Sequence, residues 1–297
     1  MSIVMFINLK GGVAKTTNAV AVAECLATNG HRTLLIDADH QCTASELLLG
    51  EDRLLRCDQR RRTLHDLLAA MIDDDFRVEQ FESFLAGCAS NITGGLPSLS
   101  VLACSVRIDD FSTNMAKGRR GYYSVDEWLR MLDRRRQQLR RWIQDKFDYA
   151  IIDCPPSIAM QVRFLLPVAD SYVVPCIPDL LSVRGSQFLA DRIRSFGYKI
   201  PPLGTLWSLY RDQNKLHHQI IEAVNKGDDR LKSIAKPFKT IIPNAAAITH
   251  ATEPGTAPHS FRAKYSTQFA GLFEKVCEEI VQRSGKLQAV ESVQVSA

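Results

Sequence analysis

The sequence lacks features that mark several classes of protein. No run of about 18 apolar residues occurs, so no segment is long enough to span a bilayer as a helix. No two of the eight cysteines stand at CxxC spacing, which disfavours a disulfide framework or a thiol-held metal or iron–sulfur cluster. The apolar N-terminal segment has no basic region or cleavage site typical of a signal peptide. We therefore expect a cytoplasmic protein with reduced, buried thiols.

The excess of positive over negative charge is also small. The formal net charge is only +4 over 297 residues, so the overall balance does not by itself indicate a nucleic-acid partner. The hydrophobic fraction is 45% and the charged fraction 24%, which is ordinary for a folded domain with a sizeable core. Any DNA-binding surface must therefore come from local clusters of basic residues.

The first forty residues predict a β-strand, a glycine-rich turn, a helix and a second strand. Residues 2–8 form a short apolar run, and residues 16–29 have apolar side chains at helical spacing before an Asn-Gly ending. Residues 32–37 (RTLLID) are typical of a buried strand. Together these segments form one βαβ unit.

The rest of the chain continues the alternation of strands and helices. We expect strands at residues 98–103, 149–153, 171–175, 203–209 and 239–242, helices at 64–72, 78–85, 126–146, 186–196, 216–225 and 268–284, and a loop at 109–125. The pattern predicts an α/β fold with a mostly parallel sheet covered by helices on both faces. We expect residues 1–285 to form a single domain that includes an enlarged variable region at 51–125. Residues 286–297 are expected to form a polar, disordered tail.

The glycine-rich turn carries the strongest functional signal. Its position between a strand and a helix suits a phosphate cradle, in which inward-turned N–H groups and the helix dipole hold phosphate oxygens. Lys15 is placed to neutralise the β- and γ-phosphates, and the Thr16 hydroxyl to ligate Mg²⁺. The predicted nucleotide contacts are Lys10, Gly11, Gly12, Val13, Ala14, Lys15, Thr16 and Thr17. The generic P-loop spacing is not met, so a glycine-rich turn with incidental lysines is the alternative.

This segment, KGGVAKTT, resembles the deviant Walker A motif KGGxGKTT of the ParA/MinD family of P-loop ATPases. The resemblance implies binding of ATP with Mg²⁺ and an ATP-dependent homodimer. It also implies that Lys10 points out of its own cradle and reaches the phosphates bound by the facing subunit. Ala14 replaces a glycine of the motif. We expect the methyl group to be tolerated if its φ is negative, with more effect on turnover than on binding.

Two more segments resemble motifs of the same family. Residues 37–41 (DADHQ) match D-x-D-x-Q, which implies that Asp39 positions or activates the attacking water and that Asp37 supports the Mg²⁺ shell. Residues 147–157 (FDYAIIDCPPS) match FDYIIIDCPPS, which implies that Asp153 acts on Mg²⁺ through water. The catalytic candidates are therefore Lys10, Lys15 and Asp39, and the metal candidates are Thr16, Asp37 and Asp153. Without the phosphate loop upstream, each aspartate would be read as a cap or turn residue.

A third match is less complete. Residues 240–244 (TIIPN) resemble TVIPRN, which borders the adenine in the family, with asparagine in place of arginine. Pro243 and Asn244 are therefore candidates for adenine contact. A plain turn after a strand is the alternative.

The fold alone does not define the biological function of a member of this family, so features outside the nucleotide site must distinguish its subgroups. The end of the chain, KLQAVESVQVSA, is a poor membrane helix, so no membrane partner is expected and a MinD-like membrane ATPase is the second choice. The absence of CxxC disfavours cluster carriers. A metabolic or redox enzyme on the same scaffold, such as a dethiobiotin synthetase-like ligase or a reductase, is a more distant alternative. No helix-turn-helix segment precedes the loop, so we do not expect binding to a specific operator.

Basic residues in the second half are candidates for non-specific DNA binding, because phosphate contacts need charge density but no base-reading geometry. The candidates are Arg192, Arg194, Lys199, Lys215, Lys226, Lys232 and Lys236, extended by Lys239. An arginine-rich helix around residues 134–141 is a second cluster, and solvated helix faces are the alternative for both. The sequence thus predicts a nucleoid-associated switch that partitions or positions DNA or another cargo with a ParB-like or adaptor protein.

Overall fold

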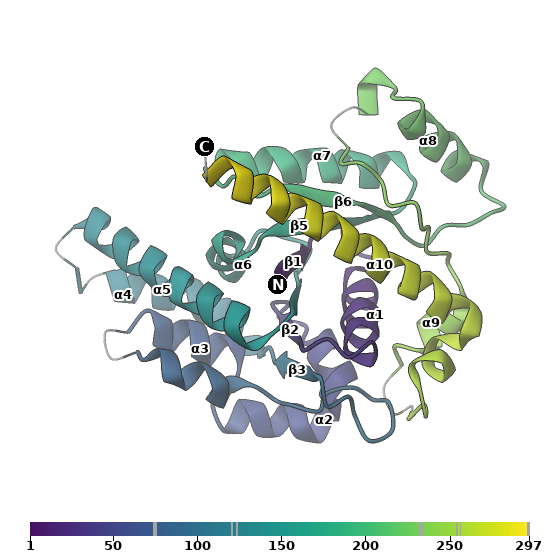
Figure 1. Ribbon diagram of the computed structural model, residues 1–297. Helices are drawn as coiled ribbons and strands as arrows, with labels where there is room; N and C mark the ends of the chain where they lie inside the picture. Colours follow the sequence, from purple (N-terminus) through teal and green to yellow (C-terminus); the bar gives the residue numbers. More distant parts are fainter. Residues whose placement is uncertain are drawn as a thin grey trace.

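The computed structural model describes residues 1–73, 76–119, 121–122, 124–231, 234–253, 255 and 257–295. Their central element is a six-stranded sheet in the order β3-β2-β4-β1-β5-β6, with every neighbouring pair parallel (Figure 1). The strands are β1 (Ser2–Phe6), β2 (Thr33–Asp37), β3 (Leu99–Leu102), β4 (Tyr149–Asp153), β5 (Ser171–Cys176) and β6 (Pro202–Trp207). The predicted α/β fold with a parallel sheet is confirmed.

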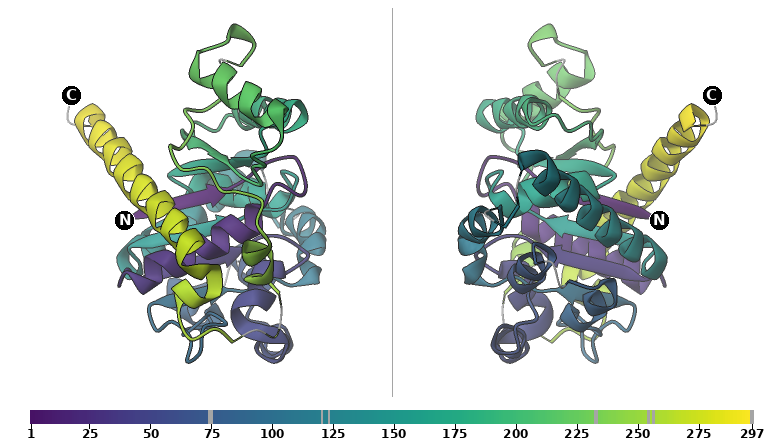
Figure 2. Two further views of the ribbon diagram at one scale, coloured as in Figure 1. Left: turned by 90° about the vertical axis from the view of Figure 1, so that its right-hand side faces the viewer. Right: turned by 90° about the vertical axis from the view of Figure 1, so that its left-hand side faces the viewer.

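Helices connect the strands and cover both faces of the sheet. They are α1 (Lys15–Thr28), α2 (Thr43–Gln59), α3 (Leu64–Met71), α4 (Phe111–Arg119), α5 (Val125–Lys146), α6 (Met160–Leu165), α7 (Leu180–Ser195), α8 (Lys215–Asn225), α9 (Ala246–His250) and α10 (Phe261–Val295). Short 3₁₀ helices lie at η1 (Val78–Phe84), η2 (Val106–Asp110), η3 (Leu166–Val168) and η4 (Asp229–Leu231). Figure 2 shows α10 crossing the molecule beside α1 and extending past the sheet.

Alternation along the central strand divides the core into two layers. Ile3 and Met5 of β1 pack with α3, α5, α6 and α7, whereas Val4 and Phe6 pack with α1, α2 and α10. Successive side chains of a strand point to opposite faces, so a strand that is apolar at every position is buried on both sides. The continuous apolar run that predicted β1 therefore also explains why helices cover both faces.

The expected strand at residues 239–242 is wrong. The N–H groups of Lys239 and Thr240 donate to the carboxylate of Glu279 on α10, at 2.8 and 2.9 Å. Only isolated contacts join this segment to β6, such as the Ile242 N–H bond to the Trp207 carbonyl at 2.8 Å. A carboxylate from a distant helix therefore takes the donors that a strand ladder would use.

The expected loop at residues 109–125 is also wrong over most of its length, because it contains α4. Phe111 is buried and meets Phe164 edge to face at a centroid distance of 5.8 Å. Gly118 lies within the expected loop, but a Cβ atom there would lie 2.9 Å from the Trp128 ring. The glycine allows close packing of α4 against α5 rather than a turn.

The last expected feature of the chain also differs. Residues 286–295 continue α10, where a disordered tail was expected. Leu287 packs against the core, and the Gln288 amide donates to the Met1 carbonyl and the Ser2 hydroxyl. These contacts with the N-terminus give the end of the helix a tertiary partner that its polar sequence does not reveal.

Candidate nucleotide-binding site

The candidate site lies where three central strands end. Because β4 lies between β1 and β2, the loop after β1, Asp37 at the end of β2 and Asp153 at the end of β4 come together. Asp37 and Asp153 are direct register partners, and the Ala38 N–H donates to the Asp153 carbonyl at 2.9 Å. Ligands of parallel α/β sheets bind outside the carboxyl ends of the strands, which is the position of this group.

Lys15 is buried at the base of the phosphate loop. Its ammonium donates to the Lys10 carbonyl at 3.3 Å, and the residue is only 7% exposed. Burial lowers the pKa of Lys15, while the nearby carboxylates of Asp153 and Asp39 raise it. Helix α1 begins at Lys15 with no side chain capping it, so its first N–H groups face the loop. The loop is thus a positively polarised cradle of the kind expected for phosphate.

Ala14 corrects one expectation. Its φ is +61° and its ψ is 36°, so the methyl group sits in the left-handed region rather than at negative φ. A residue with a Cβ atom in that region costs about 1 kcal/mol, which a glycine would not. The replacement of glycine therefore stores backbone strain at the first residue before α1.

Asp153 provides a test of whether the site fits Mg²⁺. Both carboxylate oxygens are buried and have no hydrogen-bond partner in the described part of the chain. Burial raises the pKa of Asp153 well above its usual range, and the negative charge of Asp37 adds to the effect. The Thr16 hydroxyl, which lies near Asp153 without a geometrically well-formed hydrogen bond, and the Lys15 ammonium oppose it. Unsatisfied buried carboxylate oxygens are costly, and a hydrated divalent cation would satisfy them. The arrangement of Asp153 beside Thr16 therefore fits the predicted metal.

Asp37 is bound within its own chain. Its carboxylate accepts bonds from the Ser45 N–H and hydroxyl, at 2.9 and 2.6 Å, and from the Asp39 N–H at 3.1 Å. Burial raises the pKa of Asp37 to about 6, although these hydrogen bonds oppose the shift. The Ser45 contacts join the end of β2 to the first turn of α2, a role that the sequence motif did not indicate.

Asp39 faces the same space from the loop after β2. Its Oδ1 accepts from the Gln41 N–H at 3.1 Å and lies 3.6 Å from His40 Nδ1, and the residue is 9% exposed. The Gln161 amide donates to the carbonyl of Ala38 at 3.1 Å, which holds the loop from the side of α6. Asp39 thus lies close enough to the cradle for its carboxylate to act on the Lys15 ammonium, and Gln161 is a supporting residue that the sequence did not identify.

Lys10 has a partner in its own chain. Its ammonium lies 2.9 and 3.2 Å from the two carboxylate oxygens of Asp179, and both side chains are roughly one-quarter exposed. Asp179 caps α7 by accepting from the Ser182 N–H at 2.7 Å. Burial tends to raise the pKa of Asp179, but the hydrogen bonds from Ser182 and Lys10 outweigh this effect and lower it. Sequence reasoning missed Asp179, although Asp-x-x-Ser before an apolar helix is a capping signal.

The adenine-side candidates lie next to the loop in different ways. Pro243 lines a cavity of about 110 Å³ that also borders Ala14 and Thr17. With its amide oxygen turned toward Arg211, Asn244 accepts two bonds from that guanidinium at 2.9 and 3.0 Å. Asn244 is absent from the cavity lining, so of the two only Pro243 is placed beside the cradle.

Asn18 is a further residue that sequence reasoning missed. It is fully buried on α1, and its amide donates to the Ala14 carbonyl at 2.7 Å and to the Ser208 hydroxyl at 2.9 Å. Its Oδ1 atom has no partner among the described residues. The only sequence signal was a polar residue at a buried helical position.

The DNA candidates of the second half come from several elements, and two of them, Arg194 and Lys199, line the same cavity. They lie on α7, on α8 and in the segments that follow each helix, and Lys232 falls outside the described residues. Arg194 pairs with Asp191, Lys226 pairs with Glu222 at 2.6 Å, and the Arg192 guanidinium stacks over Phe196 at 4.9 Å. Several of these charges are therefore partly neutralised or engaged within the chain.

Comparison with known proteins agrees with this geometry. Residues 1–201 match the model of the AAA domain family. The chain belongs to this family, as a short ParA-type P-loop ATPase. The chromosome-partitioning ATPase Soj of Treponema pallidum is 28% identical over 293 residues, which cover 95% of this chain and 98% of Soj.

Solved structures have the same fold as this ParA-type ATPase. The apo McdA structure from Cyanthece has a TM-score of 0.67 at 18% identity and covers 95% of this chain and 99% of its own. The septum site-determining protein MinD of Pyrococcus horikoshii, complexed with Mg-ADP, has a TM-score of 0.64 at 18% identity, with 96% and 98% covered.

The family places the chain among partition and positioning ATPases that use ATP with Mg²⁺, and the cradle of Lys15, Thr16 and Asp153 fits both. No helix within the described residues is long and apolar enough to cross a membrane. The free cysteines are mostly buried, with Cys88 exposed, and no disulfide joins them in the described part.

Proposed function

We propose that this ParA-type ATPase is a switch that dimerises when it binds ATP, then binds DNA without sequence specificity. It would position DNA or another large cargo together with a ParB-like or adaptor protein. The observation that carries the proposal is the separation of the two loop lysines. Lys15 is buried inside the cradle, whereas Lys10 lies outside it on a partly exposed ion pair with Asp179.

Within one subunit, the described residues divide the work on the nucleotide. Lys15 and the first N–H groups of α1 hold the phosphate oxygens, and Pro243 borders the base side. Thr16 and Asp153 would hold Mg²⁺, which supplies charge neutralisation at the phosphates when bound. Asp39, whose carboxylate is near enough to act on the Lys15 ammonium, orients the attacking water. Asp37 keeps the loop of Asp39 in place through its bonds to Ser45.

Between subunits, Lys10 is the residue that would connect nucleotide binding to dimerisation. Its bond to Asp179 is solvent-accessible, and ion pairs of this kind contribute only about 0.2 to 1 kcal/mol. A triphosphate on a facing subunit is a stronger acceptor for an ammonium group than one carboxylate. Lys10 therefore exchanges Asp179 for the partner's phosphates as the dimer forms, and hydrolysis reverses the exchange.

The switch is tested with a variant that traps the ATP-bound state. Asp39→Ala is expected to bind ATP, hydrolyse it at least about 100-fold more slowly, and accumulate as a dimer. Sizing chromatography with ATP and with ADP measures this, with wild-type protein as control. A variant that binds ATP but stays monomeric would contradict the proposed role of Asp39.

The same samples test the DNA partner. Wild-type protein should bind duplex DNA of unrelated sequences with ATP but not with ADP, and the affinity should fall steeply with salt. Doubling the basic surface in a dimer strengthens binding through avidity. Salt-insensitive binding, strong sequence selectivity, or ATP-dependent pelleting with liposomes in place of DNA would each argue against the proposal.

A further inference from the structure

The second half of α2 is a surface helix with its own direction. Gly50 has φ 71° and ψ 163°, which breaks the helical geometry within Thr43–Gln59. Residues 44–49 before the break supply the buried side chains of α2, and none after it is buried. Leu54 and Cys57 of the second half still pack partly against the core, but packing does not explain the exposed charged residues of the segment.

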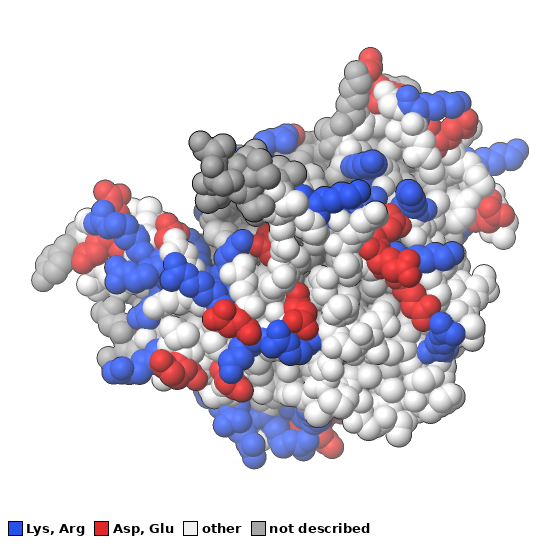
Figure 3. All heavy atoms as spheres, in the orientation of Figure 1, with Lys and Arg blue, Asp and Glu red and all other residues white. Residues whose placement is uncertain are grey.

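Four arginines gather on this exposed segment. Arg53, Arg56 and Arg60 are spaced three, four and seven positions apart, which places them on one helix face, and Arg62 follows the helix end. We call these four residues the α2 arginine face. They border a cavity of about 190 Å³ lined by Arg53, Arg56, Cys57, Arg60, Arg62, Leu85 and Ala86. Figure 3 shows basic atoms gathered along the lower edge of the molecule, where Figure 1 draws α2.

The arginines converge on a single side chain. Burial raises the pKa of the Cys57 thiol, and all four members of the α2 arginine face act on it in the opposite direction. The Arg53 guanidinium also donates to the carbonyls of Gly87 and Cys88, at 2.6 and 3.2 Å. One member of the face is therefore fixed against the protein, while the other three are exposed around it.

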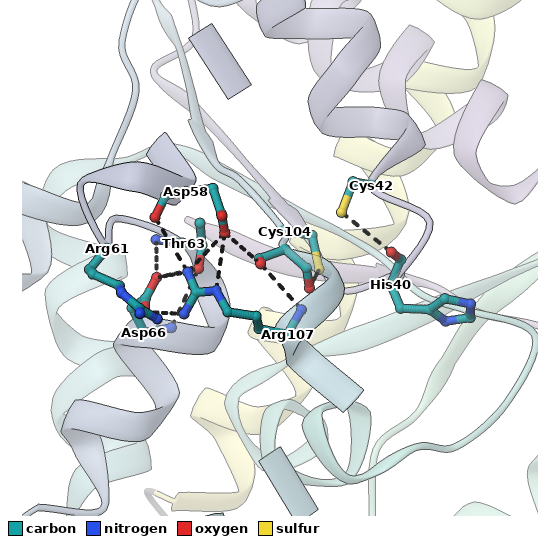
Figure 4. A network of polar contacts seen from close by, with 9 residues as sticks. His40, Cys42, Asp58, Arg61, Thr63, Asp66, Cys104 and Arg107 are labelled. Atoms are coloured by element: carbon teal, nitrogen blue, oxygen red, sulfur yellow. Dashed lines mark hydrogen bonds and ion pairs between the residues drawn. The ribbon is translucent and has the colours of Figure 1, made fainter. Parts of the chain in front are cut away.

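No carboxylate neutralises the α2 arginine face within the part of the chain that the structure describes. Two of the nearby acids, Asp58 and Asp66, are occupied elsewhere, as Figure 4 shows. Asp58 and Asp66 both bind Arg107, at 2.8 and 2.7 Å, and Arg61 contacts Asp66 at 3.9 Å. The network leaves Arg61 and Arg107 paired and the four face residues without an ion-pair partner in that part.

We propose that the α2 arginine face binds the phosphate backbone of duplex DNA. Arg53 and Arg60 lie about 10 Å apart along a helix axis, at 1.5 Å per residue. Duplex DNA carries one charge per about 1.7 Å of its axis, so a segment of that length presents several phosphates. Guanidinium groups bind phosphate oxygens through paired N–H bonds, which suits a face built of arginine rather than lysine.

This inference rests on the proposed DNA-binding function but assigns it to a different surface. Helix α2 packs beside β3 at one edge of the sheet, whereas α7 and α8 lie toward β5 and β6 at the other. The basic candidates chosen from the sequence lie on α7, on α8 and beyond. The α2 arginine face comes from the enlarged 51–125 region, for which the sequence indicated no task.

The test compares three triple variants with equal loss of charge. Arg56→Gln/Arg60→Gln/Arg62→Gln removes the exposed members of the face and keeps Arg53 as the anchor. Arg130→Gln/Arg134→Gln/Arg141→Gln removes three exposed arginines of α5, and Arg192→Gln/Arg194→Gln/Lys199→Gln removes candidates of the second half. Fluorescence anisotropy with a labelled duplex and ATP, over a salt series, measures affinity, and binding of a fluorescent ATP analogue confirms folding.

The α2 variant is expected to lose at least about tenfold in DNA affinity and to have a log K against log salt slope shallower by about 2 to 3, since each phosphate contact contributes about 0.9. The α5 variant tests the second basic cluster predicted from the sequence, and we expect α5 to be the solvated face named there as the alternative, so this variant should bind DNA within about twofold of wild type. Unchanged affinity and slope in the α2 variant, while wild type binds DNA, would overturn this inference and leave the proposed function standing.

The remaining outcomes are also decisive. Equal losses in the α2 and α5 variants would show a dependence on net charge alone, and overturn the assignment to this face. Wild-type protein that fails to bind DNA with ATP would overturn the proposed function together with this inference. Binding of the α2 arginine face to phosphatidylserine vesicles but not to DNA would replace the nucleic-acid partner with a membrane surface.

Discussion

The centre of the sheet and the outer half of α2 both present positive charge, but in opposite surroundings. At the centre, Lys15 is 7% exposed and shares its space with the buried carboxylate of Asp153. On α2, Arg56, Arg60 and Arg62 are exposed and meet water. A buried charge interacts strongly with a ligand because solvent does not screen it, whereas each exposed charge contributes little and several are needed to bind a partner. One residue is therefore decisive in the first region, and a cluster is needed in the second.

The largest expected effect comes from the buried region. Lys15→Ala removes the ammonium that offsets the triphosphate, so ATP affinity should fall by about 100-fold or more. Lys15→Gln should behave in the same way, since it keeps most of the side-chain volume without the charge. Isothermal titration with ATP measures the loss, and circular dichroism checks that the fold is kept. Wild-type affinity in either variant would contradict the assignment of the phosphate loop.

Lys10 is neither buried like Lys15 nor fully exposed like the arginines of α2. Its removal should have a small effect on nucleotide binding and a large effect on dimerisation. Lys10→Ala should bind ATP nearly normally, because Lys15 and the N–H groups of α1 remain. It should fail to dimerise, since two bonds of about 1.5 to 3 kcal/mol each are lost per dimer. Sedimentation velocity with ATP measures the dimer, and ATP turnover and DNA binding should fall with it.

Asp179→Asn is the matched partner of that variant. It releases Lys10 from its ion pair without removing the ammonium, so ATP-dependent dimerisation should strengthen by up to about fivefold per subunit. The asparagine keeps an oxygen that can cap α7. If Lys10→Ala still dimerises, or if Asp179→Asn weakens the dimer, Lys10 does not exchange between Asp179 and the facing subunit.

The smallest expected effect tests strain rather than charge. Ala14→Gly places a residue without a Cβ atom at φ +61°, which should stabilise the protein by up to about 1 kcal/mol. Ala14→Val, at the same position, should destabilise it, because a β-branched side chain fits that region poorly. Urea denaturation without nucleotide measures both changes. A stability order with glycine below alanine would show that the left-handed conformation carries no strain.

Sequence patterns predicted the centre of the fold better than its margins. The strands β1, β2 and β4 and the helix α1 follow from continuous apolar runs, helical spacing and a glycine-rich turn, all of which are local signals. The segment 239–242 has the composition of a strand, yet Glu279 from α10 takes its N–H groups. Likewise the segment around Gly118 has the composition of a loop, yet Gly118 lies in α4, where its missing Cβ atom allows close contact with the Trp128 ring.

The candidate site shows the same division. Motif spacing identified Lys15, Thr16, Asp39 and Asp153, because residues that follow a strand or begin a helix are placed by local geometry. The spacing did not indicate the partners that come from elsewhere in the chain. Asp179 lies 169 positions from Lys10, and no local pattern connects them.

The sequence by itself determined that the chain builds a phosphate-binding loop between a buried strand and a helix, since both elements and the loop are encoded within about twenty consecutive residues. Only the tertiary structure decided the environment of that loop. It set Ala14 at positive φ and paired Lys10 with Asp179. It also left the buried oxygens of Asp153 without a hydrogen-bond partner among the described residues, and turned the arginines of α2 away from the core. The physical reason is that burial and charge pairing depend on which distant segments meet, and local spacing does not specify those meetings.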